Sequence, residues 1–313
     1  MWALRQPAPY EFERIETPYP DARALVPGDV LLRFRLGGIC GSDLPTFAGV
    51  RSSDVARTGA VGASLHEIVG DVVASSDERL RVGDRVVGKV GASNGLQEAM
   101  LTPADLLHPL SDTLPDSEAI IAQPLATVLC ALDRVGPLPG RRAAVLGLGP
   151  IGMLFCVALK ARGWHVTGVD RVDRTAEAAT FGIDEPVVAQ TGEWAAGLVD
   201  RPDLVIDAIG HSQDVLADCV TAAKPHGEIY VFGLTEEHYV LPMREFFRKT
   251  LVLRAGATTD WPVHLAAAER FLIERRDLAP AYVTHTYRLA DARDAYLSAL
   301  RPAAGRLKIS LVP

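Results

Sequence analysis

The stretch Ala143-Ala-Val-Leu-Gly-Leu-Gly-Pro-Ile-Gly152 places Gly147, Gly149 and Gly152 directly after a short apolar run. Residues 151–162 predict a helix, so the glycines occupy a turn from a strand into a helix. The first glycine permits a tight turn, the second lets the backbone approach a pyrophosphate, and the third lets the helix pack close to the strand. An isolated pattern of this kind also occurs in turns that bind no ligand. In this context it predicts a dinucleotide-binding unit.

An acidic residue follows the glycine turn at the spacing that such a unit requires. Asp170 ends the next predicted strand, residues 165–170, where a carboxylate can accept hydrogen bonds from ribose hydroxyls. A carboxylate there repels a 2′-phosphate, so NAD is favoured over NADP. The adjacent Arg171 either binds such a phosphate or forms a solvated salt bridge. The expected cofactor contacts are Gly147, Gly149, Pro150, Ile151, Gly152, Asp170 and Arg171.

Strands and helices alternate from about residue 118 onward, which is typical of a doubly wound parallel sheet. A helix is expected over residues 117–132, and the backbone at Gly233 and Leu234 would position a nicotinamide ring. The predicted strands of this sheet cover residues 143–146, 165–170, 204–207 and 228–232.

The first part of the chain has a different pattern, with short apolar runs between glycines and prolines. Several short strands separated by turn residues predict a compact, barrel-like β domain. The strands are expected at residues 30–36, 68–73 and 85–90. The final part of the chain predicts a helix over 264–275, a strand over 282–287, a helix over 290–300 and a last strand over 306–311.

Two short motifs in the first part carry residues suited to binding zinc. Gly38-Ile-Cys40-Gly-Ser-Asp43 provides a thiol in a glycine-flanked loop, and His66 and Glu67 precede an apolar strand. Catalytic zinc requires a thiolate, a neutral imidazole and oxygen ligands, with one position open for substrate. Asp43 is expected to hydrogen-bond the far nitrogen of His66 and fix its tautomer. Alone, Cys40 would be a buried thiol and His66 a hydrogen-bonded core histidine.

Ser42 is the candidate proton relay, because its hydroxyl lies two residues from the expected metal ligand Cys40. It would receive the proton of an alcohol and pass it toward the ribose or solvent. Cys40 and His66 complete the expected catalytic set. The alternative is that Ser42 only hydrogen-bonds its own turn.

The overall composition excludes some classes of partner. A net charge of −7 over 313 residues argues against nucleic acid and anionic membranes, which attract basic surfaces. The longest uncharged run, residues 143–159, is shorter than the roughly 20 residues that span a bilayer. Arg5, Glu11, Glu13 and Arg14 interrupt any apolar run that could form a signal peptide.

Cysteine spacing predicts free thiols and a cytoplasmic location. Cys40, Cys130, Cys156 and Cys219 are widely scattered and form no disulfide framework.

Taken in order, these motifs resemble the medium-chain, zinc-dependent alcohol dehydrogenase superfamily over nearly the whole chain. The matching stretches include His66-Glu-Ile-Val-Gly70, Val82-Gly-Asp-Arg-Val86 and Gly305-Arg-Leu-Lys-Ile309. The resemblance implies an α/β protein in which a GroES-like β-barrel catalytic domain is joined to a Rossmann domain. The GroES-like domain would comprise residues 1–123 and 258–313, and the Rossmann NAD-binding domain residues 124–257.

Within the superfamily, the stretch Ala122-Gln-Pro-Leu-Ala126 resembles the glucose 1-dehydrogenase branch. Polyol and threonine dehydrogenases have glutamate where this chain has Gln123. The resemblance implies that Gln123 donates its amide oxygen to the metal, either directly or through water. It also implies that His264 faces the substrate, unless that side chain only hydrogen-bonds a helix start. Thr127 replaces an acidic residue that helps the glucose branch hold sugar hydroxyls, so glucose does not follow as substrate.

Further departures from the family pattern concern the number of zinc ions and the backbone that leads into His66. The lobe of four cysteines that holds a structural zinc in many members is absent, since only a short connection follows Val90. One catalytic zinc and no structural zinc are therefore expected. Leu65 stands where a glycine usually precedes the histidine. Cys130 stands where relatives often have histidine, and it is expected in a helix core.

The leading hypothesis is a zinc-dependent NAD oxidoreductase that interconverts a secondary alcohol and its ketone, on a polyol, cyclitol or sugar-like molecule. The alternative is a zinc-free or redox-neutral relative that acts on another carbonyl or an activated alkene. A third hypothesis is a nucleotide-binding protein without catalysis. The resemblance to this family also implies that the chain forms a homodimer or a homotetramer.

Overall fold

The computed structural model describes residues 1–50, 60–138, 140–210, 212–233 and 237–313. They form two compact units. The first consists of Met1–Ala126, Asp260–Pro302 and Arg306–Pro313, and the second of Thr127–Thr259 and Ala303–Gly305. No helix of the described residues is long and apolar enough to cross a membrane.

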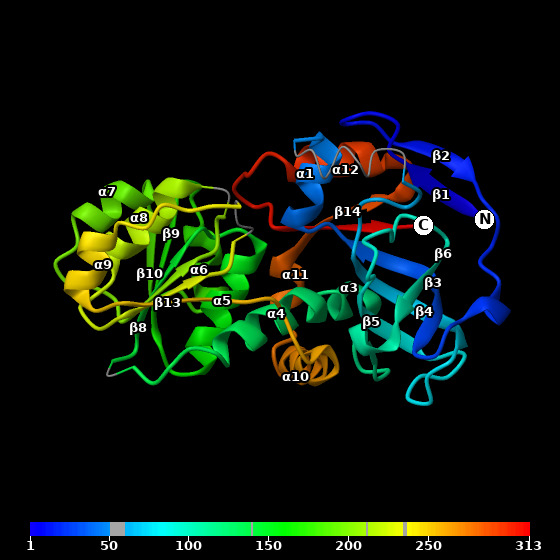
Figure 1. Cartoon of the computed structure of the whole chain (residues 1–313), viewed down its shortest axis with the longest axis horizontal. Helices are drawn as coiled ribbons and strands as arrows, with labels where there is room; N and C mark the ends of the chain where they lie inside the picture. Colours follow the sequence, from blue (N-terminus) through cyan, green and yellow to red (C-terminus); the bar gives the residue numbers. More distant parts are fainter. Residues whose placement is uncertain (51–59, 139, 211, 234–236) are drawn as a thin grey trace. The chain divides into compact units, whose positions relative to one another are not determined.

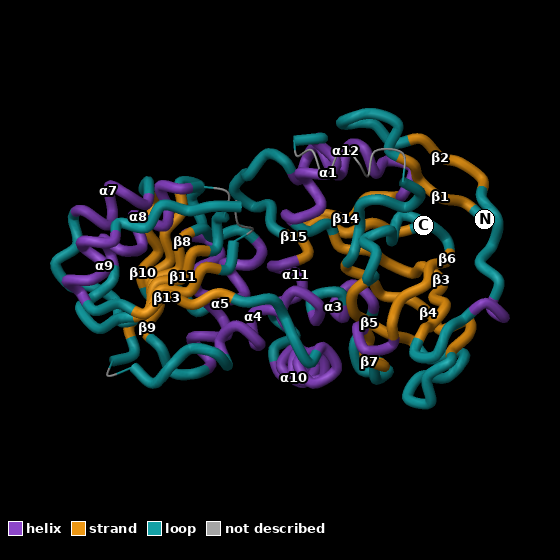
Figure 2. The backbone as a smooth tube through the Cα atoms, in the orientation of Figure 1, coloured by secondary structure: helices purple, strands orange, loops and turns teal. Residues whose placement is uncertain are grey.

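A seven-stranded, mostly antiparallel sheet forms the framework of the first unit (Figure 2). Its central strand, β3 (Asp29–Gly38), alternates buried and exposed side chains: Leu32, Phe34 and Leu36 are buried, while Arg33 and Arg35 are exposed. This period of two is that of a strand with one face on a core. The other strands are β4 (Glu67–Ser75), β5 (Arg85–Lys89), β6 (Ala99–Pro103), β7 (Leu107–Pro109), β14 (Val283–Arg288) and β15 (Lys308–Val312).

Residues from the far end of the chain complete this sheet. Strand β15 pairs antiparallel with β3, with Ser310 opposite Gly38 and Leu311 opposite Gly37. On its other side β15 pairs with β14 in parallel. The last strand therefore lies beside the residues that lead into Cys40.

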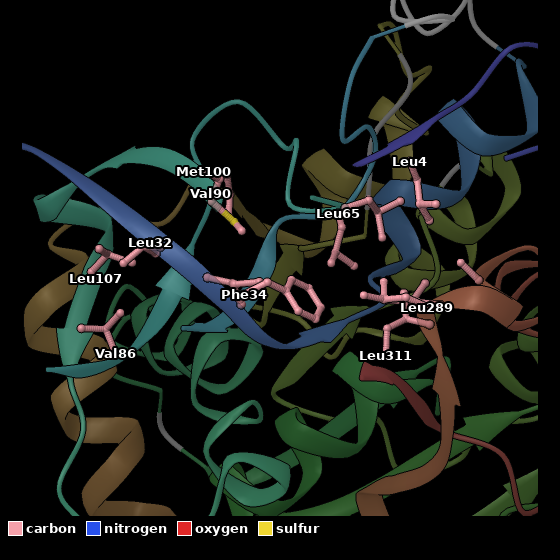
Figure 3. Close-up of a cluster of buried hydrophobic side chains, with 14 of the residues drawn as sticks. Leu4, Leu32, Phe34, Leu65, Val86, Val90, Met100, Leu107, Leu289 and Leu311 are labelled. Atoms are coloured by element: carbon pink, nitrogen blue, oxygen red, sulfur yellow. The ribbon is translucent and has the colours of Figure 1, made fainter. Parts of the chain in front are cut away.

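The core of the first unit is a cluster of buried aliphatic and aromatic side chains (Figure 3). Phe47 stacks on Phe12 with ring centroids 5.1 Å apart, and both rings contact Tyr296 of the C-terminal part. The core therefore joins residues from both ends of the chain.

A two-stranded sheet and several short helices complete the first unit. The sheet pairs β1 (Trp2–Arg5) with β2 (Glu13–Glu16). The helices are α1 (Leu44–Ala48), α3 (Asp116–Ala119), α10 (Trp261–Glu274), α11 (Leu278–Tyr282) and α12 (Ala292–Ala299), with 3-10 turns η1 (Ala22–Ala24), η2 (Gly41–Asp43), η3 (Ala104–Leu106) and η5 (Leu289–Asp291).

The second unit is built on a six-stranded sheet in which every pairing is parallel, with strand order β10-β9-β8-β11-β12-β13. Figure 1 labels its strands β8, β9, β10 and β13 among the helices of this unit. The strand order reverses between β8 and β11, as in a Rossmann sheet. The strands are β8 (Arg142–Leu146), β9 (His165–Asp170), β10 (Glu185–Val188), β11 (Leu204–Asp207), β12 (Glu228–Val231) and β13 (Val252–Ala255).

Helices connect these parallel strands, as a doubly wound sheet requires. They are α5 (Pro150–Ala161), α6 (Ala178–Phe181), α7 (Thr191–Ala196), α8 (Gln213–Ala222) and α9 (Met243–Lys249), with the 3-10 turn η4 (Thr175–Glu177). The predicted fold class, a GroES-like β domain joined to a Rossmann sheet, is confirmed.

Several predicted elements have other bounds in the structure: α10 begins at Trp261 and not at 264, and β15 begins at Lys308 and not at 306. Two further differences have a local cause. The helix expected over residues 117–132 is interrupted: α3 ends at Ala119, and α4 (Ala122–Leu132) begins after a two-residue turn. Pro124 has no N–H to donate to the carbonyl of Ile120, so it is tolerated in the first turn of α4 but not within one continuous helix. The strand expected from residue 282 begins one residue later, because Tyr282 ends α11.

Candidate functional site

The structure brings Cys40, His66 and Glu67 together. Cys40 follows the end of β3, and Glu67 begins β4 directly after His66. Because β3 pairs with β4 so that Gly38 lies opposite Glu67, both motifs meet at one end of this strand pair. The thiol, an imidazole nitrogen and a carboxylate oxygen of these residues all lie within 4.8 Å of one another.

Asp43 links two of these residues through hydrogen bonds. Its Oδ1 lies 2.8 Å from Nδ1 of His66, and its Oδ2 accepts a bond of 2.9 Å from the backbone N–H of Cys40. The hydrogen bond expected between Asp43 and His66 is therefore present. When Nδ1 donates to the carboxylate, the Nε2 lone pair is left for a metal ion.

The ionisation of His66 reflects this pairing. Burial disfavours the imidazolium, but the carboxylate of Asp43 and the nearby Cys40 outweigh burial and raise the pKa of His66 well above its ordinary value. The protonated, imidazolium form of His66 is therefore favoured in the metal-free chain. A bound metal ion would replace that proton.

Glu67 has a partner that the sequence motifs did not indicate. Nζ of Lys308 donates a 2.6 Å hydrogen bond to Oε1 of Glu67 and a 3.0 Å bond to the carbonyl of Ile39. Both side chains are almost fully buried, with 2% of Lys308 and 0% of Glu67 exposed. The signal in the sequence was a lysine at the start of a mainly apolar strand, Lys308–Val312.

Glycine is required beside this ion pair. A Cβ atom at Gly38 would lie 2.4 Å from Oε2 of Glu67 and 3.3 Å from Cε of Lys308. The glycine before Ile39 in the cysteine motif therefore leaves room for the Glu67 carboxylate.

The residues fit a zinc ion. Thiolate, imidazole and carboxylate are the donor types that zinc prefers. Both carboxylate oxygens of Glu67 lie close to Nζ of Lys308, Oε1 at 2.6 Å and Oε2 at 2.5 Å, so the carboxylate is neutralised in the metal-free chain. Its ligand oxygen still lies within 4.8 Å of the Cys40 and His66 donors, which is the reach of a shared metal ion. Cys40 is only half-buried, and Ser42, in η2, is exposed. These positions leave the thiol side of the cluster accessible to a small molecule.

The remaining residues expected at the metal and substrate sites differ in burial and in hydrogen bonding. Gln123 is 3% exposed in the first turn of α4, and its predicted role as an oxygen donor stays a prediction. Nδ1 of His264 lies 3.1 Å from the carbonyl of Asp260, which is the helix-start hydrogen bond considered as an alternative. Thr127 is half-buried within α4.

In the second unit, the three glycines of the turn after β8 have different surroundings. Gly147 has a φ of +91°, which favours glycine. A Cβ at Gly152 would lie 1.8 Å from the carbonyl oxygen of Gly147, whereas a Cβ at Gly149 would meet nothing within 4 Å. Gly152 therefore permits close packing, and Gly149 leaves open space at the start of α5, where a phosphate could approach.

Asp170 lies at the end of β9 and contacts this turn. Its Oδ2 accepts a 2.6 Å hydrogen bond from the N–H of Leu148, and its Oδ1 accepts a 2.8 Å bond from Val172. Each carboxylate oxygen has a second lone pair, so ribose hydroxyls can still donate to it. Arg171 is exposed. A second arginine of this region, Arg174, is only 4% exposed and was not identified from the sequence.

The loops that follow β11 and β12 pass close to each other. Asp207 is fully buried, and burial raises its pKa despite N–H donors at Ile209 and Gly210. A Cβ at Gly233 would lie 2.1 Å from the nitrogen of Gly210, so these two loops require glycine at that contact. Gly233 is at an expected cofactor position, and Leu234 lies outside the described residues.

Comparison with known proteins gives matches in both units. The alcohol dehydrogenase GroES-like domain matches residues 26–112, and the zinc-binding dehydrogenase family matches residues 150–268. A sorbitol dehydrogenase of Bombyx mori is 32% identical over 263 residues, which cover 69% of this chain and 73% of that protein. An L-arabinitol 4-dehydrogenase of Aspergillus oryzae is 23% identical, with 92% and 87% of the two chains covered.

Solved structures show the same fold over the full chain. The alcohol dehydrogenase TADH from Thermus sp. ATN1 has a TM-score of 0.83 at 25% identity, covering 100% of this chain and 99% of that chain. An E. coli CFT073 structure described as a short chain alcohol dehydrogenase complexed with NADH has the same TM-score at 24% identity, with the same coverage.

Proposed function

Because this chain belongs to the medium-chain, zinc-dependent alcohol dehydrogenase superfamily, and is an alcohol dehydrogenase, we propose that it acts on a polyol, cyclitol or sugar-like substrate. The reaction interconverts a secondary alcohol and its ketone by hydride transfer. Polyol dehydrogenases among its relatives support this substrate class.

The observation that carries the proposal is the cluster of Cys40, His66 and Glu67, with ligand atoms within 4.8 Å. These residues would hold a single catalytic zinc, and Gln123 would add an amide oxygen directly or through water. When bound, the metal supplies a Lewis acid that lowers the pKa of the alcohol, and NAD supplies the hydride acceptor.

The protein's own groups orient the reactants and move the proton. Asp43 fixes the ring of His66 through Nδ1, and Lys308 fixes Oε1 of Glu67. The exposed hydroxyl of Ser42 takes the alcohol proton and passes it to solvent. His264 and Thr127 are proposed to contact the substrate.

The cofactor is proposed to be NAD. The glycine turn would hold the pyrophosphate, Asp170 would accept the ribose hydroxyls, and Gly233 would position the nicotinamide. The carboxylate of Asp170 disfavours a 2′-phosphate. We further propose that the protein is cytoplasmic and forms a homodimer or a homotetramer.

The test is metal content together with turnover. Protein purified without added zinc or chelator should hold one zinc per chain, and Cys40→Ala should lose it. The wild type should reduce NAD with members of a polyol and cyclitol panel, and Cys40→Ala should not. Folded, NADH-binding protein that holds no zinc yet turns over carbonyl or alkene substrates would instead support the zinc-free alternative.

A further inference from the structure

A cavity in the first unit includes none of the proposed metal ligands. It has a volume of about 550 Å³, within the range of small-molecule sites. Strands β1 and β2 form one wall, and the end of β14 with η5 and the start of α12 forms the other. The lining residues that matter for binding are Trp2, Leu4, Phe12, Arg14, Arg288 and Leu289.

The floor of this cavity is apolar and held in place by the core. Leu4 and Leu289 are at most 9% exposed (Figure 3). The ring of Trp2 packs edge-on against Phe34 at 5.7 Å, and Phe12 stacks on Phe47. Fixed aromatic faces offer apolar contact area that needs no rearrangement on binding.

The rim carries positive charge. Three arginines and no aspartate or glutamate line the cavity among the described residues, although the whole chain has a net charge of −7. Arg293 is held in the wall, since its Nε donates a 3.0 Å hydrogen bond to the carbonyl of Tyr10, and Asp294 partly balances its charge from 3.8 Å. Within the part of the chain that the structure describes, the guanidinium groups of Arg14 and Arg288 have no hydrogen-bond or ion-pair partner.

Acidic residues on the same strand as Arg14 are already paired elsewhere. Glu13 forms an ion pair with Arg5, and Oε2 of Glu16 lies 3.5 Å from the amino group of Met1. The positive charge at the cavity rim is therefore not neutralised by its neighbours on β2.

We propose that this cavity binds an amphipathic carboxylate, with the apolar body on Trp2, Phe12 and Leu289 and the carboxylate on Arg14 and Arg288. Guanidinium groups match the planar, two-oxygen geometry of a carboxylate. The site is separate from the proposed metal centre and does not depend on the proposed function.

The test uses naphthalene-2-carboxylate as the probe and calorimetry on the full chain with saturating NADH. Arg288→Ala should weaken binding about fivefold, as expected for loss of a partly exposed ion pair, and added salt should weaken it further. Arg23→Ala is the matched control, because Arg23 is exposed, pairs with Asp21 and lies outside the lining.

Two results would overturn the proposal. Equal affinity of the neutral analogue naphthalene-2-carboxamide would show an apolar groove without anion recognition. Binding that survives Arg288→Ala but disappears in Cys40→Ala would place the probe at the metal centre. Thermal unfolding of each variant checks that Arg288→Ala is folded, and polyol oxidation, measured separately, tests the proposed function.

Discussion

Nζ of Lys308 and Oε1 of Glu67 are 2.6 Å apart, and the two side chains form a buried ion pair at one edge of the proposed metal centre. Removing one partner of such a pair leaves an uncompensated charge in the core. Lys308→Met should therefore lower the free energy of unfolding of the metal-free protein by about 3–5 kcal/mol, measured by urea denaturation.

A surface ion pair supplies the control for this prediction. Lys160 is 46% exposed and lies 2.5 Å from Asp184, which is 25% exposed, so Lys160→Met should cost less than about 1 kcal/mol. If Glu67→Gln is combined with Lys308→Met, the double variant should lose less stability than the two single losses added together. Equal effects of Lys308→Met and Lys160→Met would contradict the role given to the buried pair.

Asp43→Asn should weaken zinc binding about 10–100-fold. The amide cannot supply the carboxylate that holds Nδ1 of His66 at 2.8 Å. Competition with a chromophoric chelator measures the affinity. Asp71→Asn is the control, because Asp71 pairs with the exposed Arg33, and zinc affinity should not change in that variant. An unchanged affinity in Asp43→Asn would remove Asp43 from the metal site.

Two alanine substitutions in the glycine turn should separate folding from cofactor binding. Gly152→Ala places a Cβ 1.8 Å from the carbonyl oxygen of Gly147, so it should destabilise the protein by about 1–3 kcal/mol. Gly149→Ala meets no atom within 4 Å and should leave the unfolding midpoint nearly unchanged. It should weaken NADH binding about tenfold in a fluorescence titration, because the new methyl group occupies the proposed phosphate approach. Tight NADH binding by Gly149→Ala would place the phosphates elsewhere.

Asp170→Asn should shift cofactor preference toward NADP. The amide removes the charge that repels a 2′-phosphate, and its oxygen can still accept a hydrogen bond from Leu148 or Val172. The ratio of kcat/KM for NAD to that for NADP should fall about tenfold, which corresponds to about 1.4 kcal/mol. An unchanged ratio would show that Asp170 only holds the turn.

Glu269 in α10 gives a prediction of pH-dependent stability. Burial raises its pKa, but hydrogen bonds from Ser111 and His108 outweigh burial and leave the pKa below the ordinary 4.5. A lowered pKa in the folded state stabilises the protein above the unfolded value, and that contribution is lost as pH falls through the folded value. Glu269→Gln should therefore cost about 1 kcal/mol at pH 7.

The same comparison at lower pH checks the sign. In urea denaturation the difference between wild type and Glu269→Gln should shrink below the ordinary pKa of 4.5. Ser111→Ala should reproduce part of the loss at neutral pH, since Ser111 Oγ donates a 2.8 Å bond to Oε1. A difference that grows on acidification would contradict the assignment.

The sequence predicted those parts of the fold and site that are encoded locally. The turn from β8 into α5 was predicted because its glycines, the preceding apolar run and the following helix are contiguous. Cys40 and His66 were identified from short motifs, and the pairing of β3 with β4 brings them together. The role of Asp43 was predictable because it lies three residues from Cys40.

Contacts between distant segments were not predictable from local pattern. Lys308 and Glu67 are 241 residues apart in sequence, and only the pairing of β15 with β3 places Lys308 beside the site. The sheet-edge strands β10 and β13 were not predicted, because Pro186 and Arg254 interrupt their short, largely unburied apolar runs. The acidic Asp207 ends an apolar strand, but its burial depends on the loop after β12.

The dependence of Glu67 on Lys308 also sets an order of events during protein synthesis. The ribosome delivers Cys40, His66 and Glu67 early, and the whole Rossmann sheet follows before β15 emerges. Domains generally fold from the N-terminus as the chain is made. Until Lys308 has been synthesised, the carboxylate of Glu67 has no cationic partner, whereas the second unit can already form. A nascent chain stalled before residue 308 should therefore show a protease-resistant Rossmann unit and a protease-sensitive first unit, so completion of the metal centre reports that translation has reached the last strand.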